Sequence, residues 1–127
     1  VKVGLSAGEC GISYYLPRLI GAGRAFEIML TGRPVRGPEA HSIGLISDIV
    51  EPNTLRERAI ELARVIASNA PYSIKHTKQV MWANLENNFE AALELENHVQ
   101  VVGLLTQDFE EAAKAFTQKR QPVFTGK

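Results

Sequence analysis

Glu9 is the acidic residue of this sequence best placed for acid–base chemistry. It lies between Gly8 and Cys10, where an expected strand at 1–3 is followed by an expected helix at about 11–19. Small neighbours at such a turn let a ligand approach, and a carboxylate there can accept or donate a proton. The simpler interpretation is a carboxylate in the first turn of the helix, where it stabilises the helix dipole. Both interpretations stay open on these residues alone.

Ser6 lies in a G-x-S-x-G motif at 4–8, the pattern of a hydrolase nucleophile elbow. Asp48 follows, and then His76 or His98, which gives the order Ser, Asp, His that such hydrolases use. The two histidines fall inside expected helices rather than on a loop after a late strand, and no glycine-rich oxyanion segment is present. A serine hydrolase using Ser6 is therefore a weak alternative.

Composition excludes several other classes. His41, His76 and His98 are far apart, and none has metal-ligand spacing to another His or to a Cys, so we predict no metal site. The 14 basic and 14 acidic residues balance without a basic stripe, which argues against nucleic acid as a partner. No apolar run approaches the roughly 18–20 residues that cross a bilayer, which argues against a membrane. The single cysteine, Cys10, fits a cytoplasmic location.

Charge is unevenly distributed near the C-terminus. No acidic residue follows Glu111, whereas Lys114, Lys119, Arg120 and Lys127 do. A basic tail on an otherwise neutral chain can hold a phosphorylated ligand. The alternative is a solvated, frayed terminus.

The elements that position these residues change character along the chain. Alternation at 1–3 and the apolar segment at 46–50 predict two short strands, so the beginning is expected to be α/β and the remainder mainly α. Pro17 is expected to break the first helix or turn it early. Gly32 and Gly44 are expected to end two helices, Gly32 in the C-cap role. The expected helices are 11–19, 24–30, 38–43, a helix capped by Asn53 and running through Ile66, 71–85, 89–105 and 108–118.

The expected helix at 89–105 is apolar on almost every side near its end. A helix that is apolar all round must be buried all round. We therefore expect a subunit interface here, the alternative being burial among the chain's own helices. The residues concerned are Val99, Val101, Val102, Leu104 and Leu105.

Five groups of short motifs follow one another along the sequence. They are V-G-L-S-A-G-E-C-G at 3–11 with L-P-R-L-I-G at 16–21, L-T-G-R at 30–33 with E-A at 39–40 and G-L-I at 44–46, N-A-P at 69–71 with T-K at 77–78, A-F at 115–116, and K-R at 119–120 with P-V-F-T-G at 122–126. Each motif alone is weak. In this order they span essentially the whole chain, and they resemble the C-terminal half of the enoyl-CoA hydratase/isomerase, or crotonase, family.

The resemblance implies a protein that acts on acyl-CoA thioesters, by hydration or double-bond isomerisation of enoyl-CoA in fatty-acid metabolism. Family members bind the thioester carbonyl in an oxyanion hole of two backbone N–H groups, and coenzyme A is part of the substrate rather than a cofactor. The implied fold is a spiral of ββα units followed by helices that form trimers, often paired into hexamers. In this chain, 1–52 would be the end of the α/β core and 53–127 the helical oligomerisation region.

The resemblance also assigns roles to individual residues. Glu9 lies near a position where isomerase-type members carry a catalytic acid. Phe116 and Lys119 match positions that contact the CoA nucleotide, often from a neighbouring subunit, and Lys119 would pair with phosphate.

Three aromatic residues are candidates for an acyl pocket. They are Tyr14, Tyr15 and Trp82, although aromatic side chains at helical spacing are also typical of a core. The family's oxyanion-hole segments and hydratase carboxylates would lie upstream of Val1. The alternative to an enzyme is therefore a non-catalytic module that oligomerises or binds acyl-CoA.

Overall fold

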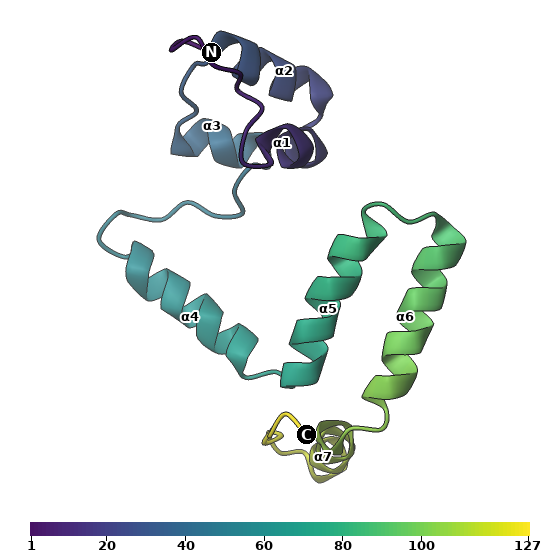
Figure 1. The fold of residues 1–127 in the computed structure, drawn as a ribbon. Helices are drawn as coiled ribbons and strands as arrows, with labels where there is room; N and C mark the ends of the chain where they lie inside the picture. The colour runs from purple at the N-terminus through teal and green to yellow at the C-terminus, as the bar shows by residue number, and fades with distance from the viewer. The chain divides into compact units, whose positions relative to one another are not determined.

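The computed structural model describes all residues, Val1–Lys127, and contains seven helices and no strand. The chain divides into two compact units, Val1–Leu55 and Arg56–Lys127 (Figure 1). None of the seven helices combines the length and the apolar composition that crossing a membrane requires.

Three helices make up the first unit: α1 (Ile12–Ile20), α2 (Ala22–Thr31) and α3 (Gly37–Ser42). The core of the unit lies where α1 packs against α2. Its buried side chains are Leu16 and Ile20 from α1 and Ala25 from α2, and partly buried Ile28, Met29, Ile43 and Leu45 pack against them. Gly32 ends α2 in the left-handed conformation, as predicted, with φ 58° and ψ 27°.

The prediction that Pro17 breaks or turns the first helix is wrong, because α1 runs through Pro17 to Ile20. A proline inside a helix removes one backbone donor and crowds the preceding turn. Here Leu16 and Ile20 are both buried in the core of the unit, and burial of two large apolar side chains offsets that cost. The helix ends at Gly21, whose N–H donates to the Pro17 carbonyl at 3.0 Å.

The two predicted strands are also wrong. Residues 1–3 form a turn instead, closed by a hydrogen bond from the Gly4 N–H to the Val1 carbonyl at 3.1 Å, and 46–50 is irregular. A strand is stable only when a neighbouring strand satisfies its backbone groups. These two short segments do not pair with each other, so the beginning of the chain is helical rather than α/β.

Four helices follow: α4 (Leu55–Ala67), α5 (Pro71–Asn84), α6 (Phe89–Gly103) and α7 (Gln107–Gln118). Asn88 caps α6 by accepting from the Ala91 N–H at 2.9 Å, and Thr106 caps α7 by accepting from the Phe109 N–H at 3.2 Å. Pro71 starts α5 as predicted. The predicted cap Asn53 is wrong, because α4 begins only at Leu55.

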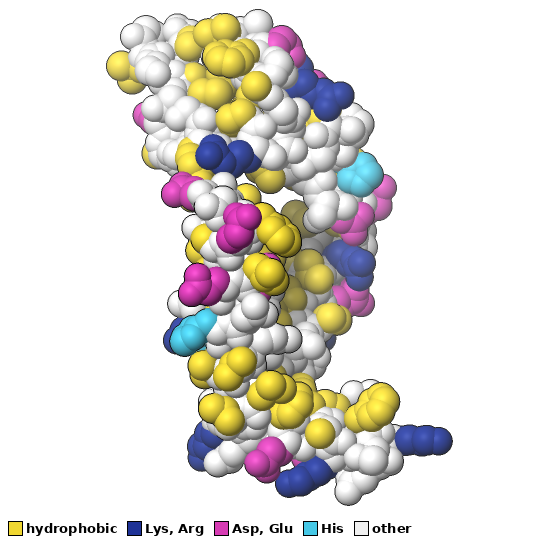
Figure 2. All heavy atoms as spheres, turned by 90° about the vertical axis from the view of Figure 1, so that its right-hand side faces the viewer, with side chains coloured by type: hydrophobic (Ala, Val, Ile, Leu, Met, Phe, Trp, Pro, Cys, Tyr) yellow, Lys and Arg dark blue, Asp and Glu magenta, His cyan; other side chains and the backbone are white.

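The second unit buries very little. Helices α4, α5 and α6 contain no buried residue, and α7 buries only Asp108 and Ala115. The apolar end of α6 is largely exposed, with Val101 at 59%, and Leu105, just after the helix, is 82% exposed. Hydrophobic side chains accordingly lie on the surface in Figure 2. The other helices of this unit therefore do not bury this end of α6.

Candidate functional site

The C-terminal end of α7 has an unusual backbone. Lys119 follows the last helical residue with φ 55° and ψ 38°, in the left-handed region. Its N–H donates to the Phe116 carbonyl at 3.2 Å, and the Arg120 N–H donates to the Ala115 carbonyl at 3.0 Å. These two bonds define a Schellman motif, in which glycine normally occupies the left-handed position. Lys119 holds that position at a steric cost that glycine would avoid.

Phe116 and Lys119 are both exposed at this end of α7. Phe116 is 87% exposed, which is extreme for a large aromatic side chain. An exposed aromatic ring can stack on a nucleobase, and a lysine ammonium in the next turn can pair with phosphate. The structure therefore brings together the two residues predicted to contact the CoA nucleotide.

Arg120 and Glu111 form a bidentate ion pair beside this turn. The Arg120 Nη1 and Nη2 atoms lie 2.5 Å and 2.9 Å from the two Glu111 carboxylate oxygens. The Val123 N–H donates to the same carboxylate at 2.9 Å. Hydrogen bonding to Arg120, followed by that from Val123, lowers the pKa of Glu111 to about 2. The same ion pair raises the pKa of Arg120.

Asp108 fixes the remainder of the C-terminal tail to α7. The residue is buried, at 2% exposed. It accepts from the Thr125 N–H at 2.7 Å and from the Gly126 N–H at 2.9 Å. The Asp108 N–H in turn donates to the Lys127 carbonyl at 3.2 Å. The tail is thus folded back and bonded to the helix, and the prediction of a frayed terminus is wrong.

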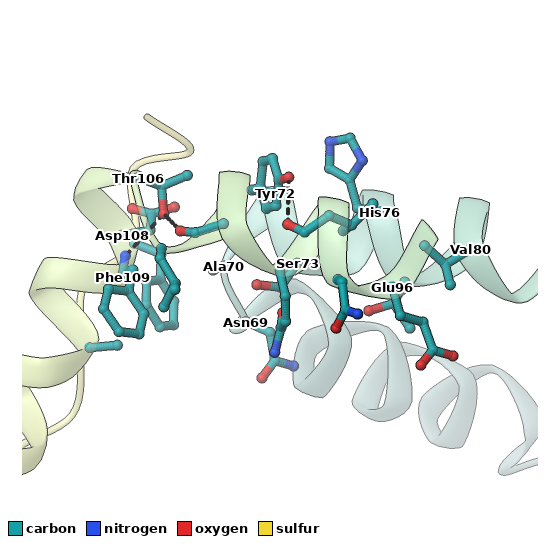
Figure 3. A pocket seen from close by; sticks show the side chains of 18 of the residues that line it. Asn69, Ala70, Tyr72, Ser73, His76, Val80, Glu96, Thr106, Asp108 and Phe109 are labelled. Atoms are coloured by element: carbon teal, nitrogen blue, oxygen red, sulfur yellow. Dashed lines mark hydrogen bonds between the residues drawn. The ribbon is translucent and has the colours of Figure 1, made fainter. Parts of the chain in front are cut away.

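A cavity of about 720 Å³ lies among α5, α6 and α7 (Figure 3). On its α5 side the Tyr72 hydroxyl donates to the Val99 carbonyl at 3.0 Å, and the His76 ring lies 4.1 Å from the Tyr72 ring. Asp108 and Phe124 line it from α7 and the tail. Its lining mixes apolar and polar side chains without a cluster of metal ligands.

None of the three aromatic residues predicted for an acyl pocket lines this cavity. Tyr14 and Tyr15 lie on α1 and meet edge to face at 5.1 Å, and the Arg18 guanidinium covers the Tyr14 ring at 3.5 Å. Trp82 lies on α5, in the other unit, and is 54% exposed. Their role as an acyl pocket stays a prediction.

Glu9 lies on an exposed loop before α1. Its carbonyl accepts from the Ile12 N–H at 3.0 Å, and the helix begins at Ile12 without an acidic residue in its first turn. The helix-dipole interpretation of Glu9 is therefore wrong. The next residue, Cys10, has φ 50°, and with Lys119 it is one of two non-glycine residues in the left-handed region. A catalytic role for Glu9 stays a prediction.

Ser6 lacks the setting of a nucleophile elbow. No strand precedes it, and its hydroxyl accepts a hydrogen bond from the Gly8 N–H at 3.0 Å within the loop. His76 and His98 lie within α5 and α6, as the sequence predicts. The local structure at Ser6 gives the hydrolase alternative no support.

The ion pairs and charged hydrogen bonds that fix these segments were not predicted from the sequence. Arg33 bridges Glu27 and Glu39, each at 2.6 Å, and its hydrogen bonds lower the pKa of both carboxyl groups. Asp108 and Glu111 fix the tail in a similar way. The only available signal was their spacing of three residues on one helix, followed by a tail without acids.

Comparisons with known proteins give a consistent result. Residues 1–127 match the family model described as enoyl-CoA hydratase/isomerase. A probable enoyl-CoA hydratase of Mycobacterium tuberculosis is 44% identical over 98% of this chain, which covers 45% of that protein. The 1,2-epoxyphenylacetyl-CoA isomerase of Escherichia coli is 34% identical over 99% of the chain, which covers 48% of it.

A structural comparison leads to the same family. The crystal structure of a probable enoyl-CoA hydratase/isomerase from Mycobacterium abscessus matches with a TM-score of 0.90 and 41% identity, over 99% of this chain and 49% of that one. The chain thus spans about half the length of the curated relatives it matches.

Proposed function

The chain belongs to the enoyl-CoA hydratase/isomerase family and corresponds to the C-terminal part of its members, and on this premise we propose that it serves a protein that hydrates or isomerises enoyl-CoA thioesters. Its own contribution is to bind the nucleotide end of coenzyme A and to assemble subunits. It does so in the cytoplasm. Relatives named as hydratase and as isomerase both match, so the proposal covers both reactions.

The observation that carries this proposal is the exposed pair at the end of α7. Phe116 is almost fully exposed, and Lys119 holds a left-handed backbone that a lysine adopts at a cost. Neither feature improves the stability of this chain. Both are useful if the ring stacks on adenine and the ammonium pairs with a phosphate of coenzyme A.

Glu9 is the chain's candidate for proton transfer. A carboxylate on an exposed loop is accessible to a substrate, and one that moves a proton between carbons of an enoyl chain acts as general base and then as general acid. The developing charge on the thioester oxygen needs an oxyanion hole. The family resemblance assigns that hole to its N-terminal half. Tyr14, Tyr15 and Trp82 are proposed to contact the acyl chain.

Subunit assembly follows from the exposed apolar helices. Large exposed apolar areas on a folded protein mark interaction surfaces. In α4, Leu62 and Val65 are 56% and 63% exposed, and Leu105, just after α6, is 82% exposed. We propose that these helices form a homotrimer, or a hexamer of paired trimers.

The test uses trans-2-butenoyl-CoA and two optical signals. Loss of the conjugated enoyl-thioester absorbance reports turnover, and emission of Trp82, the only tryptophan, reports binding. We expect this chain to bind the thioester, with a change in emission, and to leave the absorbance constant because it lacks the proposed oxyanion-hole segments. A chain that causes no emission change and binds no CoA by calorimetry would contradict the proposal.

The same assay separates the alternatives. Binding and assembly with no turnover, even in a longer chain that includes the family's N-terminal half, would favour the non-catalytic module. The other outcome is that the longer chain turns the thioester over. If Glu9→Gln then lowers the turnover rate at least about tenfold, the result favours the enzyme and the role of Glu9.

A further inference from the structure

We infer that the Glu111–Arg120 ion pair is a positioning device that holds Lys119 in its left-handed conformation and so presents the Lys119 ammonium, beside the exposed Phe116 ring, to the nucleotide end of a CoA thioester. The inference rests on the proposed function for its ligand. It adds two residues that touch no substrate and act through their neighbours.

One arginine fixes the backbone on both sides of Lys119. Arg120 follows it directly, and its guanidinium reaches back to Glu111 on α7. The same guanidinium donates to the Gln118 side-chain oxygen at 2.6 Å and to the Gln121 carbonyl at 3.1 Å. The residues on both sides of Lys119 are therefore bonded to one rigid, planar group.

Glu111 also fixes the direction in which the chain continues after Lys119. The Val123 N–H donates to the same Glu111 oxygen that Arg120 contacts. If Lys119 relaxed to the right-handed conformation, α7 would continue past Gln118, and Arg120 and Val123 would leave Glu111. The carboxylate of Glu111 therefore stabilises the turn only while Lys119 keeps φ near 55°.

The left-handed backbone conformation of Lys119 has a steric cost. Glycine would adopt the same backbone without steric crowding, yet this position carries a lysine with an exposed side chain. Backbone strain kept by surrounding contacts is typical of functional positions. A network that enforces this strain and leaves Lys119 exposed positions its ammonium for a ligand, next to the exposed Phe116 ring.

The first experiment measures the positioning without any ligand. Glu111→Gln keeps an oxygen that can accept from Val123 but removes the charge that binds Arg120. Amide hydrogen exchange of Lys119 and Arg120 should become at least roughly tenfold faster in this variant. The matched control is Glu110→Gln, one residue earlier, whose carboxylate faces Lys114 at 3.7 Å. Equal exchange in wild type and Glu111→Gln would overturn the inference.

The second experiment links the positioning to binding through a double-mutant cycle. Lys119→Ala and Glu111→Gln should each weaken CoA binding, by about tenfold for Lys119→Ala. Glu111→Gln should have no further effect once Lys119 is alanine. Additive losses would overturn the positioning role.

The two proposals fail in different ways. A wild-type chain that does not bind CoA would overturn the proposed function, and the nucleotide-presenting role of the ion pair with it. If Lys119→Ala weakens CoA binding but Glu111→Gln leaves it unchanged, only the positioning role of the ion pair is overturned.

Discussion

Lys119 illustrates a conflict between stability and binding at a single residue. A non-glycine residue in the left-handed region costs about 1 kcal/mol or more. Lys119→Gly should therefore raise the free energy of unfolding by about 1 kcal/mol, while CoA affinity falls because the ammonium is gone. Denaturant unfolding and a CoA titration on the same variant measure both quantities.

Gly32 provides the matching control, since it occupies the same left-handed position at the end of α2. Gly32→Ala should lower the free energy of unfolding, because a Cβ there would lie 3.0 Å from the Val1 side chain. If Lys119→Gly lowered stability as well, the left-handed turn would not be strained, and the functional explanation of the lysine would lose its basis.

The pKa of Glu111 makes a prediction about pH. This pKa is lowered from 4.5 to about 2 in the folded chain, so the ionised carboxylate stabilises folding fully above pH 4.5. That stabilisation is lost as the pH falls towards 2, because folding then no longer favours proton release. Wild type should thus lose stability relative to Glu111→Gln between these pH values, as unfolding midpoints would show. A constant difference between the two proteins across this range would contradict the assignment.

At the scale of the element, the C-terminal tail depends on Asp108. Replacing it by alanine leaves the Thr125 and Gly126 N–H groups without their acceptor. Hydrogen bonds to a charged acceptor contribute roughly 1.5–3 kcal/mol. We expect Asp108→Ala to lower the unfolding free energy by that amount and to make 122–127 sensitive to proteolysis. Asp108→Asn keeps one acceptor oxygen and should lose less; equal losses would contradict this account of the tail.

The success of sequence prediction differs between element types for a physical reason. Helices and their ends depend on local signals, so Gly32 and Pro71 were predicted in the roles the structure gives them. Strands depend on partners elsewhere, and the segments 1–3 and 46–50 have none here. The prediction that Pro17 breaks the first helix was wrong, because burial of Leu16 and Ile20 outweighs the helix-breaking propensity of proline.

In the candidate site, too, local features can be predicted from the sequence more readily than contacts between distant residues. Phe116 and Lys119 were predicted from the family resemblance of their motifs, and their role stays a prediction. The Glu111–Arg120 pair was missed, because the chain must reverse at Lys119 before the two side chains can meet. A left-handed lysine has no recognisable sequence signal, since glycine or asparagine is the usual residue at such a turn.

At the scale of the whole molecule, the family resemblance seen in the motifs is confirmed by the match over residues 1–127. The exposed apolar side chains then predict self-association. Leu62→Glu on α4 should shift the chain towards smaller species in sedimentation velocity. Arg56→Glu places the same negative charge elsewhere on α4 and should leave the assembly unchanged. A wild-type chain that is monomeric at all concentrations would contradict the proposed assembly.

The most direct test of the central claim is a calorimetric titration of CoA into three proteins: the wild-type chain, Lys119→Ala, and Lys114→Ala as a control for removing a lysine from α7. We predict that the wild type binds, that Lys119→Ala binds about tenfold more weakly, and that Lys114→Ala behaves as wild type. If the wild type does not bind, or if both variants lose affinity equally, the end of α7 is not a specific site for coenzyme A.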